Sequence, residues 1–373
     1  MNPLYSLILE IESGVVKGHI VVPRAHSPRD NHEFSTDTLW SASALISGAP
    51  HRDSFHLLSS MTKALSNVLS ILAKDMAHEA VAHQLVSFDC ILSSPWITVS
   101  SRSVSIAYDK PTVVTQQRVL DIMSIERKKL AQPDMAIVEQ KLFDVAINGY
   151  SIAEFNNKKA RELSVFFGIG MTSEVIVEHI NNTIVAHFAY AKGKITCQSD
   201  TLLHYASSRN ITREDPSFIS AHVHGELSDF FIVDNGRISR ITSLPFGYQT
   251  LNRYVAGQTG ESHDTSASKV TLHAANALHR DEHNRTSKHI DMAVQDKWAQ
   301  VFLDTTENEL LPYEIMLNVP KQYYPHFKRA LENMLEERVA RSNKDGKDGI
   351  LAKTQRFVVT HVNTDVLHRL FRI

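Results

Sequence analysis

The sequence predicts an α/β protein with more than one domain. At 373 residues the chain is longer than a typical single domain of about 100–200 residues. Segments with the alternating pattern of strands and segments with the 3.6-residue period of amphipathic helices follow one another along the chain. Two strand–turn–strand segments, at 7–22 and 219–244, also share one plan, which suggests two related sheets.

The first half of the chain begins with the hairpin at 7–22, which is broken by Ser13-Gly14. Polar residues at 24–38 indicate a loop, and apolar residues at helical spacing predict one or two helices over 54–83. The further elements expected in this half are strands at 86–92 and 97–108, a helix at 115–131, strands at 138–148 and 163–169, a helix at 172–183 and a strand at 184–190.

The second half is expected to open with a helix at 200–208 and the hairpin at 219–244. Asn235-Gly236 supplies the positive φ angles that a tight turn needs. The remaining expected elements are helices at 248–256, within 257–287 and at 288–303, a strand at 313–319, a helix at 325–339 and a strand at 357–362.

Composition excludes several classes of protein. Hydrophobic residues make up 43% and charged residues 21%, which excludes a disordered chain or a fibre. The 39 Lys and Arg against 41 Asp and Glu leave no basic excess, so we expect no nucleic-acid partner. No apolar run approaches the ~18 residues that cross a bilayer, and the N-terminus lacks the pattern of a signal peptide. We therefore expect a cytoplasmic protein.

Cysteine, glycine and histidine contents are unusual. Cys90 and Cys197 are too few for a disulfide framework or a thiolate metal site, and we expect buried, reduced thiols. The 14 glycines make the chain poor in phosphate-wrapping loops, and the 20 histidines make its charge sensitive to pH between 5 and 8.

The turns of the two hairpins carry the most informative residues. Residues 10–17 read EIESGVVK, and residues 222–229 read HVHGELSD. With the exit at 243–247 (SLPFG), they match in order and spacing the two phosphate motifs of the actin-like ATPases. The chain resembles the FtsA/PilM branch of that superfamily, the bacterial cell-division and type IV pilus assembly proteins. The resemblance extends over nearly the whole chain.

This resemblance implies a two-lobed actin-like fold with duplicated ribonuclease H-like sheets. It places a first lobe at 1–85, an inserted α+β subdomain at 86–170 and a second lobe at 171–373, with a helical subdomain at about 258–310. In the family, the two hairpins face each other across a cleft that binds ATP with Mg²⁺. The positions that correspond to nucleotide-binding residues are Glu10, Ser13, Gly14, Lys17, Gly225, Glu226, Ser228 and Asp229.

Three departures weaken the nucleotide motifs. Glu12 and His224 replace glycines whose absence of a side chain lets phosphate approach the backbone. His222 replaces an acidic residue, and 318–320 (NVP) stands where the family has an adenosine-contacting Gly-Gly. We expect a pseudo-ATPase with no bound cofactor and propose no catalytic residue. The retained motif residues leave altered binding of ATP with Mg²⁺ open.

Histidines offer a second, metal-based hypothesis. His222 and His224 alternate on one strand face, and Glu226 continues that face, so the three could hold a metal ion. We favour a space-filling role and assign no metal, because the sequence identifies no Cys or distant His that would complete the set. His279 and His283 lie four apart without an HExxH motif, and we expect a solvated helix face.

The C-terminal residues 364–373 form a short amphipathic segment. Its apolar face consists of Val366, Leu367, Leu370 and Phe371, beside Arg369 and Arg372. FtsA proteins attach to the membrane by such a helix, so these residues are candidates for contact with a membrane or a partner. We favour packing on the chain's own domain, because ten residues make only ~15 Å of helix.

The expected function is that of a cytoplasmic scaffold of PilM type, with weak or no ATP hydrolysis. It would recruit a membrane-anchored pilus or division protein through a short cytoplasmic peptide at the inner membrane face. Self-association stays open. The alternative is an FtsA-like division protein that binds ATP, polymerises and attaches to the membrane by its C-terminal helix.

Overall fold

The computed structural model describes most of the chain in two units. The described residues are 5–23, 36–46, 54–78, 85–211, 217–276, 280–302, 311–312, 314–344 and 358–361. Their contacts divide them into unit 1, which comprises residues up to 207 together with 236–239, and unit 2, which comprises 208–235 and the residues from 240 onwards. The expected domain boundaries stay a prediction.

Unit 1 is built on a mixed sheet. Its strands are β1 (Tyr5–Ile11), β2 (Val15–Pro23), β3 (Thr36–Leu45), β4 (Leu85–Leu92) and β9 (Ile195–Ser199), in the order β3-β2-β1-β4-β9. β1 pairs antiparallel with β2 and parallel with β4, and β4 pairs parallel with β9. The order follows from the hairpin at the start of the chain, to which β3 adds at the β2 side and β4 and then β9 add at the β1 side.

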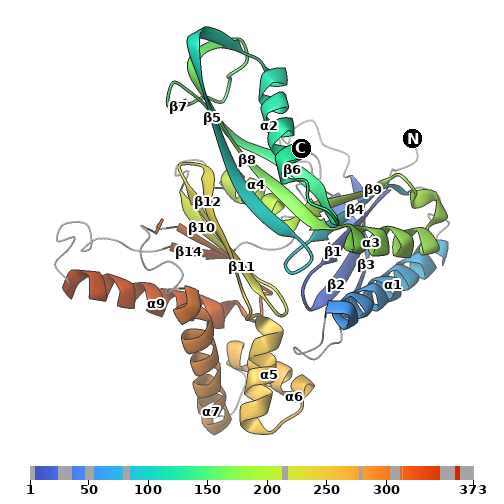
Figure 1. Ribbon diagram of the computed structural model, residues 1–373. Helices are drawn as coiled ribbons and strands as arrows, with labels where there is room; N and C mark the ends of the chain where they lie inside the picture. Colours follow the sequence, from blue (N-terminus) through green and yellow to red (C-terminus); the bar gives the residue numbers. More distant parts are fainter. Residues whose placement is uncertain are drawn as a thin grey trace, which may run out of the picture. The chain divides into compact units, whose positions relative to one another are not determined.

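Helices cover both faces of this sheet. The helices α1 (Ser54–His78) and α3 (Glu174–His187) lie side by side on one face, over a core that contains Leu9, Leu65 and Phe88 (Figure 1). The first turns of α4 (Asp200–Ile211) cover the other face, where Leu203 packs against Ile8. A 3₁₀ turn, η2 (Ala189–Ala191), follows α3.

An antiparallel sheet is inserted in unit 1 between β4 and α3. Its strands are β5 (Thr98–Val114), β6 (Met135–Ile147), β7 (Tyr150–Ser151) and β8 (Lys158–Ser173), in the order β5-β8-β6-β7. The helix α2 (Gln116–Leu130) lies along this sheet and buries Val119, Ile122 and Met123 (Figure 1). Thr115 caps α2 by accepting a hydrogen bond from the Arg118 N–H.

Unit 2 repeats the sheet topology of unit 1. Its strands are β10 (Phe218–Val223), β11 (Ser228–Asp234), β12 (Arg237–Leu244), β13 (Glu314–Asn318) and β14 (Val358–His361), in the order β12-β11-β10-β13-β14. In chain order, each sheet therefore runs third, second, first, fourth, fifth. The parallel pairs β10–β13 and β13–β14 occupy the places of β1–β4 and β4–β9. The shared plan of the two hairpins thus extends to two whole sheets.

The helices of unit 2 surround an aromatic core. They are α5 (Tyr248–Thr259), α6 (His263–Ala274), α7 (Arg280–Asp291), the π-helical η3 (Met292–Ala299) and α9 (Tyr324–Lys344). Trp298 is fully buried, with its ring centroid 5.4 Å from that of Phe230 and 4.8 Å from that of Phe327. No helix among the described residues is both long and apolar enough to span a bilayer.

The structure confirms the α/β class and most of the expected elements. Asn235 and Gly236 have φ of 48° and 76°, as the hairpin signal predicts. The expected strand at 184–190 is wrong: α3 continues to His187, because Ile180 and Ile184 keep the helical spacing of its buried face. The expected loop at 24–38 is wrong in its last residues, since β3 begins at Thr36 and pairs with β2.

Candidate functional site

The first candidate turn connects β1 to β2 and is held by main-chain hydrogen bonds. The Glu12 N–H donates to the Val15 carbonyl at 3.0 Å, and the Ile46 N–H donates to the Gly14 carbonyl at 3.0 Å. The Trp96 indole N–H donates to the Glu12 carbonyl at 2.8 Å. Ser13 is buried. The Glu12 N–H and the carbonyls of Glu12 and Gly14 are therefore engaged within unit 1.

Acidic and basic side chains of this hairpin pair with one another. Glu10 is the register partner of Lys17, and Glu12 lies two residues further along the same face. The Lys17 ammonium contacts the Glu12 carboxylate and lies 3.5 Å from a Glu10 oxygen. His19 Nε2 lies 3.6 Å from the other Glu10 oxygen. The retained lysine of the phosphate motif is thus held by two carboxylates of its own hairpin.

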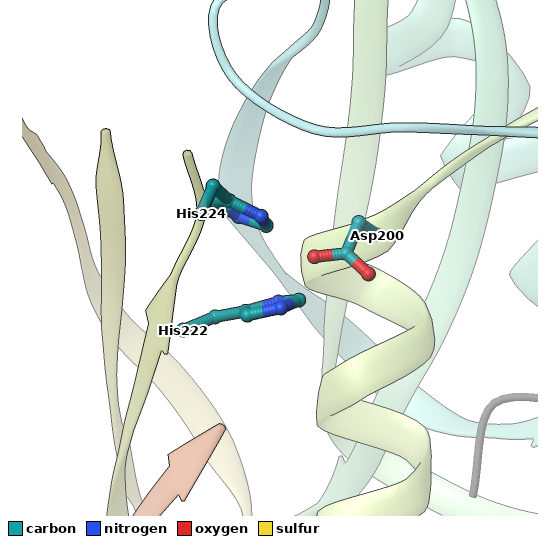
Figure 2. A group of neighbouring side chains, drawn as sticks. All are labelled: Asp200, His222 and His224. Carbon is teal, nitrogen blue, oxygen red and sulfur yellow. The ribbon is translucent and has the colours of Figure 1, made fainter. Parts of the chain in front are cut away.

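Glu10 has an unusual protonation equilibrium. Burial raises the pKa of its carboxyl group to about 7, because the charged form loses hydration. The Lys17 ammonium opposes this shift of the pKa, whereas the Glu12 and Asp200 carboxylates add to it. Asp200 is the first residue of α4 (Figure 2). We did not predict from the sequence that Asp200 would affect the pKa of Glu10. An acidic residue at a helix start directly after a strand is nevertheless a recognisable signal.

The second candidate turn connects β10 to β11 and packs against the start of α5. The N–H groups of Tyr248 and Gln249 donate to the carbonyls of His224 and Gly225, at 3.0 and 2.7 Å. A Cβ atom on Gly247 would lie 2.3 Å from the His224 carbonyl oxygen, so only glycine allows this approach. Two main-chain donors at the helix N-terminus, the usual place for a phosphate, are used by the protein's own backbone.

The retained polar residues of the second motif make internal contacts. Buried Ser228 donates to the Phe246 carbonyl at 2.6 Å and accepts from the Trp298 indole N–H at 2.9 Å. The Asp229 carboxylate accepts from the Ser243 hydroxyl at 2.5 Å. The Glu226 carboxylate binds the Arg253 guanidinium through both oxygens. These side chains therefore stabilise unit 2 itself.

The two histidines of the second motif are buried with their rings together. The ring centroids of His222 and His224 lie 3.9 Å apart at 43° (Figure 2). His222 Nε2 is 3.0 Å from the Asn318 amide nitrogen, and His224 Nε2 is 3.2 Å from an Asp229 oxygen. Asn318, at the expected adenosine position, thus pairs with a histidine. Glu226, the third member of the metal hypothesis, pairs with Arg253.

The surroundings of His283 on α7 differ from the expectation. His283 was expected on a solvated helix face, but its ring stacks on that of His273 with centroids 4.0 Å apart. His273 is buried, and the ring of His326 on α9 also lies beside it, with ring centroids 5.2 Å apart. The expectation was wrong because α6, α7 and α9 pack together. His279 and the C-terminal candidates Val366, Leu367, Leu370 and Phe371 lie outside the described residues.

Comparisons with known proteins identify the fold. No protein-family model matches the chain, and no curated protein sequence matches it. PilM, in a structure of a PilM–PilN type IV pilus biogenesis complex, matches with a TM-score of 0.55 at 10% identity, over 89% of this chain and 86% of that one. The ethanolamine utilization protein EutJ from Carboxydothermus hydrogenoformans matches with a TM-score of 0.46 at 10% identity, over 99% and 89%. The likeness to PilM shows that the chain has the actin-like ATPase fold, as predicted.

Proposed function

We infer that the chain is a non-enzymatic scaffold of PilM type. In this proposal it recruits a membrane-anchored partner for type IV pilus assembly and binds or hydrolyses ATP weakly or not at all. The fold that it shares with PilM supports the class of protein. The state of the two turns supports the loss of nucleotide binding. The first and the second turn support this loss separately.

The pairing of Lys17 is the observation that carries the proposal. A phosphate-loop cation must be available to the nucleotide, but the Lys17 ammonium is held by the Glu10 and Glu12 carboxylates. A triphosphate at this turn would meet the Glu12 carboxylate and the partly protonated Glu10 as well as Lys17, so the turn offers it no net positive charge. A like-charge pair 4 Å apart costs about 4 kcal/mol at an effective dielectric constant of 20, so repulsion by the Glu12 carboxylate offsets the attraction to Lys17.

The second turn supports the same conclusion independently. Ser228 and Asp229 are bound by Phe246, Trp298 and Ser243. A nucleotide or its hydrated Mg²⁺ that engaged these side chains would have to replace their hydrogen bonds, each with a net value of about 1 kcal/mol, and would leave the buried partners of Ser228 unsatisfied. The acidic residue that remains in the motif is thus committed to the structure of unit 2.

We propose the partner by its chemical class. PilM is seen in a complex with PilN. By analogy, we assign to this chain a short cytoplasmic peptide of a membrane-anchored pilus protein. Because the turns need no nucleotide to hold their shape, the interaction should not depend on ATP.

Fluorescence anisotropy with the purified full chain tests this proposal. The labelled probes are synthetic peptides with the cytoplasmic tail sequences of single-span membrane proteins encoded beside its gene. We expect one pilus-type tail to bind saturably, with the same affinity with and without ATP and Mg²⁺. A scrambled peptide of the same composition is the control. Failure of every tail to bind, or binding only with ATP and Mg²⁺, would contradict the proposal.

A further inference from the structure

The two cysteines of the chain lie directly opposite each other although 106 residues separate them in sequence. Cys90 on β4 is the register partner of Cys197 on β9. Neighbouring strands lie about 4.8 Å apart, and register partners project to the same face of the sheet. This spacing falls within the range of roughly 4.4–6.8 Å between the Cα atoms of disulfide-bonded cysteines. The register therefore places the Cα atoms of the two cysteines at a separation that a disulfide bond can span.

The two thiols differ in access to solvent. Cys90 is fully buried in the core of unit 1, beside residues such as Phe88. Cys197 is half-buried on β9, which ends the order of described strands in this sheet. Cys197 is therefore the more accessible of the two residues to a small solute.

The contact between the thiols also gives them different reactivity. The hydrogen bond with Cys90 lowers the pKa of the Cys197 thiol, although burial works in the opposite direction. The same hydrogen bond, together with burial, raises the pKa of the Cys90 thiol well above its ordinary value. The thiolate is the reactive form of cysteine, and burial disfavours it at Cys90, so the more exposed Cys197 is assigned as the nucleophile and Cys90 as the thiol that follows.

We propose that Cys197 and Cys90 form an oxidation site for hydroperoxides, in which Cys197 reacts first and Cys90 closes an intramolecular disulfide. The Cys197 thiolate attacks one oxygen of hydrogen peroxide, the O–O bond breaks, and hydroxide leaves. Cys197 becomes a sulfenic acid. The Cys90 sulfur then attacks the Cys197 sulfur, the S–O bond breaks, and water leaves with the Cys90 proton. Two thiols are oxidised and one peroxide is reduced to two waters.

This site is independent of the proposed scaffold function. It uses neither phosphate turn and requires no nucleotide or partner. Its consequence is a covalent link between β4 and β9, the strand that leads into α4 and Asp200. Oxidation therefore fixes the strand next to a helix start that carries part of the first candidate site.

The test exposes the folded full chain to hydrogen peroxide, removes the oxidant, and alkylates the remaining thiols after unfolding. Mass spectrometry should show that wild-type protein loses both alkylatable thiols together, with a mass lower by two hydrogens and no dimer. Dithiothreitol should restore both thiols. Retention of both thiols, or an intermolecular dimer as the main product, would overturn the proposal.

Two matched variants resolve the order of events. In Cys90→Ser, Cys197 should stop at a sulfenic acid that dimedone traps. In Cys197→Ser, Cys90 should stay reduced, because it is fully buried. Oxidation of Cys90 in Cys197→Ser at the wild-type rate would contradict the assigned roles. If either variant melts at a lower temperature than wild type, the mass measurement on wild-type protein alone decides whether the disulfide forms.

Discussion

At the scale of single residues, the first turn is defined by how Glu10, Glu12 and Lys17 share charge. The sequence predicted that Glu12 fills a place where related proteins keep glycine. It did not predict that Glu12 would hold Lys17, because a motif comparison assigns each position separately. The register across the hairpin brings these residues together. The effect of Asp200 on the pKa of Glu10 depends on where α4 begins. Sequence patterns locate the start of a helix only approximately.

Replacing Glu10 by Gln should stabilise the protein at high pH. The pKa of Glu10 is raised from 4.5 to about 7, so the folded state keeps its proton longer than the unfolded state. The Glu10 carboxyl group therefore contributes fully to the free energy of unfolding below pH 4.5, and this contribution is lost as pH rises through 7. We expect Glu10→Gln to raise the free energy of unfolding by about 1–2 kcal/mol at pH 8 and to leave it unchanged at pH 4.5.

Urea unfolding at the two pH values measures this effect. Glu154→Gln, at an exposed position, serves as the control and should change little at either pH. An equal effect of Glu10→Gln at pH 8 and pH 4.5 would show that burial of the carboxyl group is not its cause.

The stacked histidines of unit 2 should make the protein sensitive to acid. His273 has no hydrogen bond to either ring nitrogen among the described residues. Burial, followed by the charges of His326, His283 and Arg329, lowers its pKa to about 4. Burial also lowers the pKa of His326, while Asp291 opposes that shift. A lowered histidine pKa gives stability that is full above pH 6.5 and is lost as pH falls towards 4.

We expect wild-type protein to lose about 1–2 kcal/mol of unfolding free energy from His273 between pH 7 and pH 5. His273→Phe keeps a planar ring but cannot bind a proton, so it should remove that part of the pH dependence. His263→Phe, at a half-exposed position on the same helix, is the control and should retain it. Urea midpoints at the two pH values provide the measurement. Parallel pH dependence in wild type and His273→Phe would refute this account.

At the scale of elements, the hairpins and the main helices could be predicted because their patterns are local. Alternating apolar residues and Asn235-Gly236 were enough to place the second hairpin and its turn. The segment 184–190 was misread because isoleucine and valine favour strands. Packing of Ile184 in the core of unit 1 extends the helix instead. Long-range contacts, such as that of Trp298 with Ser228, leave no local signal.

Ser228 links the second turn to the core, so its removal should reduce stability. Ser228→Ala leaves the buried Phe246 carbonyl and the Trp298 indole N–H without this partner. We expect a loss of about 2–3 kcal/mol in unfolding free energy. Ser268→Ala, at an exposed position of α6, should cost far less. If chemical denaturation gives equal stabilities for Ser228→Ala and wild type, the hydroxyl has no structural role and a ligand role regains support.

Gly18 sets the distance between β2 and α1. A Cβ atom there would lie 2.6 Å from Val68 Cγ1 and 2.8 Å from Leu72 Cδ1, both closer than real contacts. Gly18→Ala should therefore cost about 1–3 kcal/mol through overpacking. The added mutation Val68→Ala should recover part of this loss by making room. Thermal unfolding of the single and double variants measures the coupling. Strictly additive losses would show that the two positions do not touch.

At the scale of the whole molecule, the repeated strand order is the clearest outcome. The similarity of two short turns predicted two related sheets, and the structure shows the same order in each unit. The actin-like fold was predictable because the apolar patterns of its strands and helices and the order of the two turns can be read from the sequence. The state of the site was not predictable, since it depends on which side chains replace a ligand's contacts. We expect these side chains to prevent nucleotide binding.

Thermal unfolding of the full chain with ATP and Mg²⁺ tests that claim most directly. A dissociation constant of about 10 μM would give roughly 2.7 kcal/mol of stabilisation at 1 mM nucleotide, or several degrees in melting temperature. The variant Glu12→Gly, which removes one carboxylate from Lys17, reports whether charge at the first turn is the obstacle. We predict an unchanged melting temperature with nucleotide for wild type. A rise confined to the variant would locate the obstacle at the first turn, and no rise in either protein would show that the second turn also prevents binding. A rise of several degrees in wild type would contradict the account.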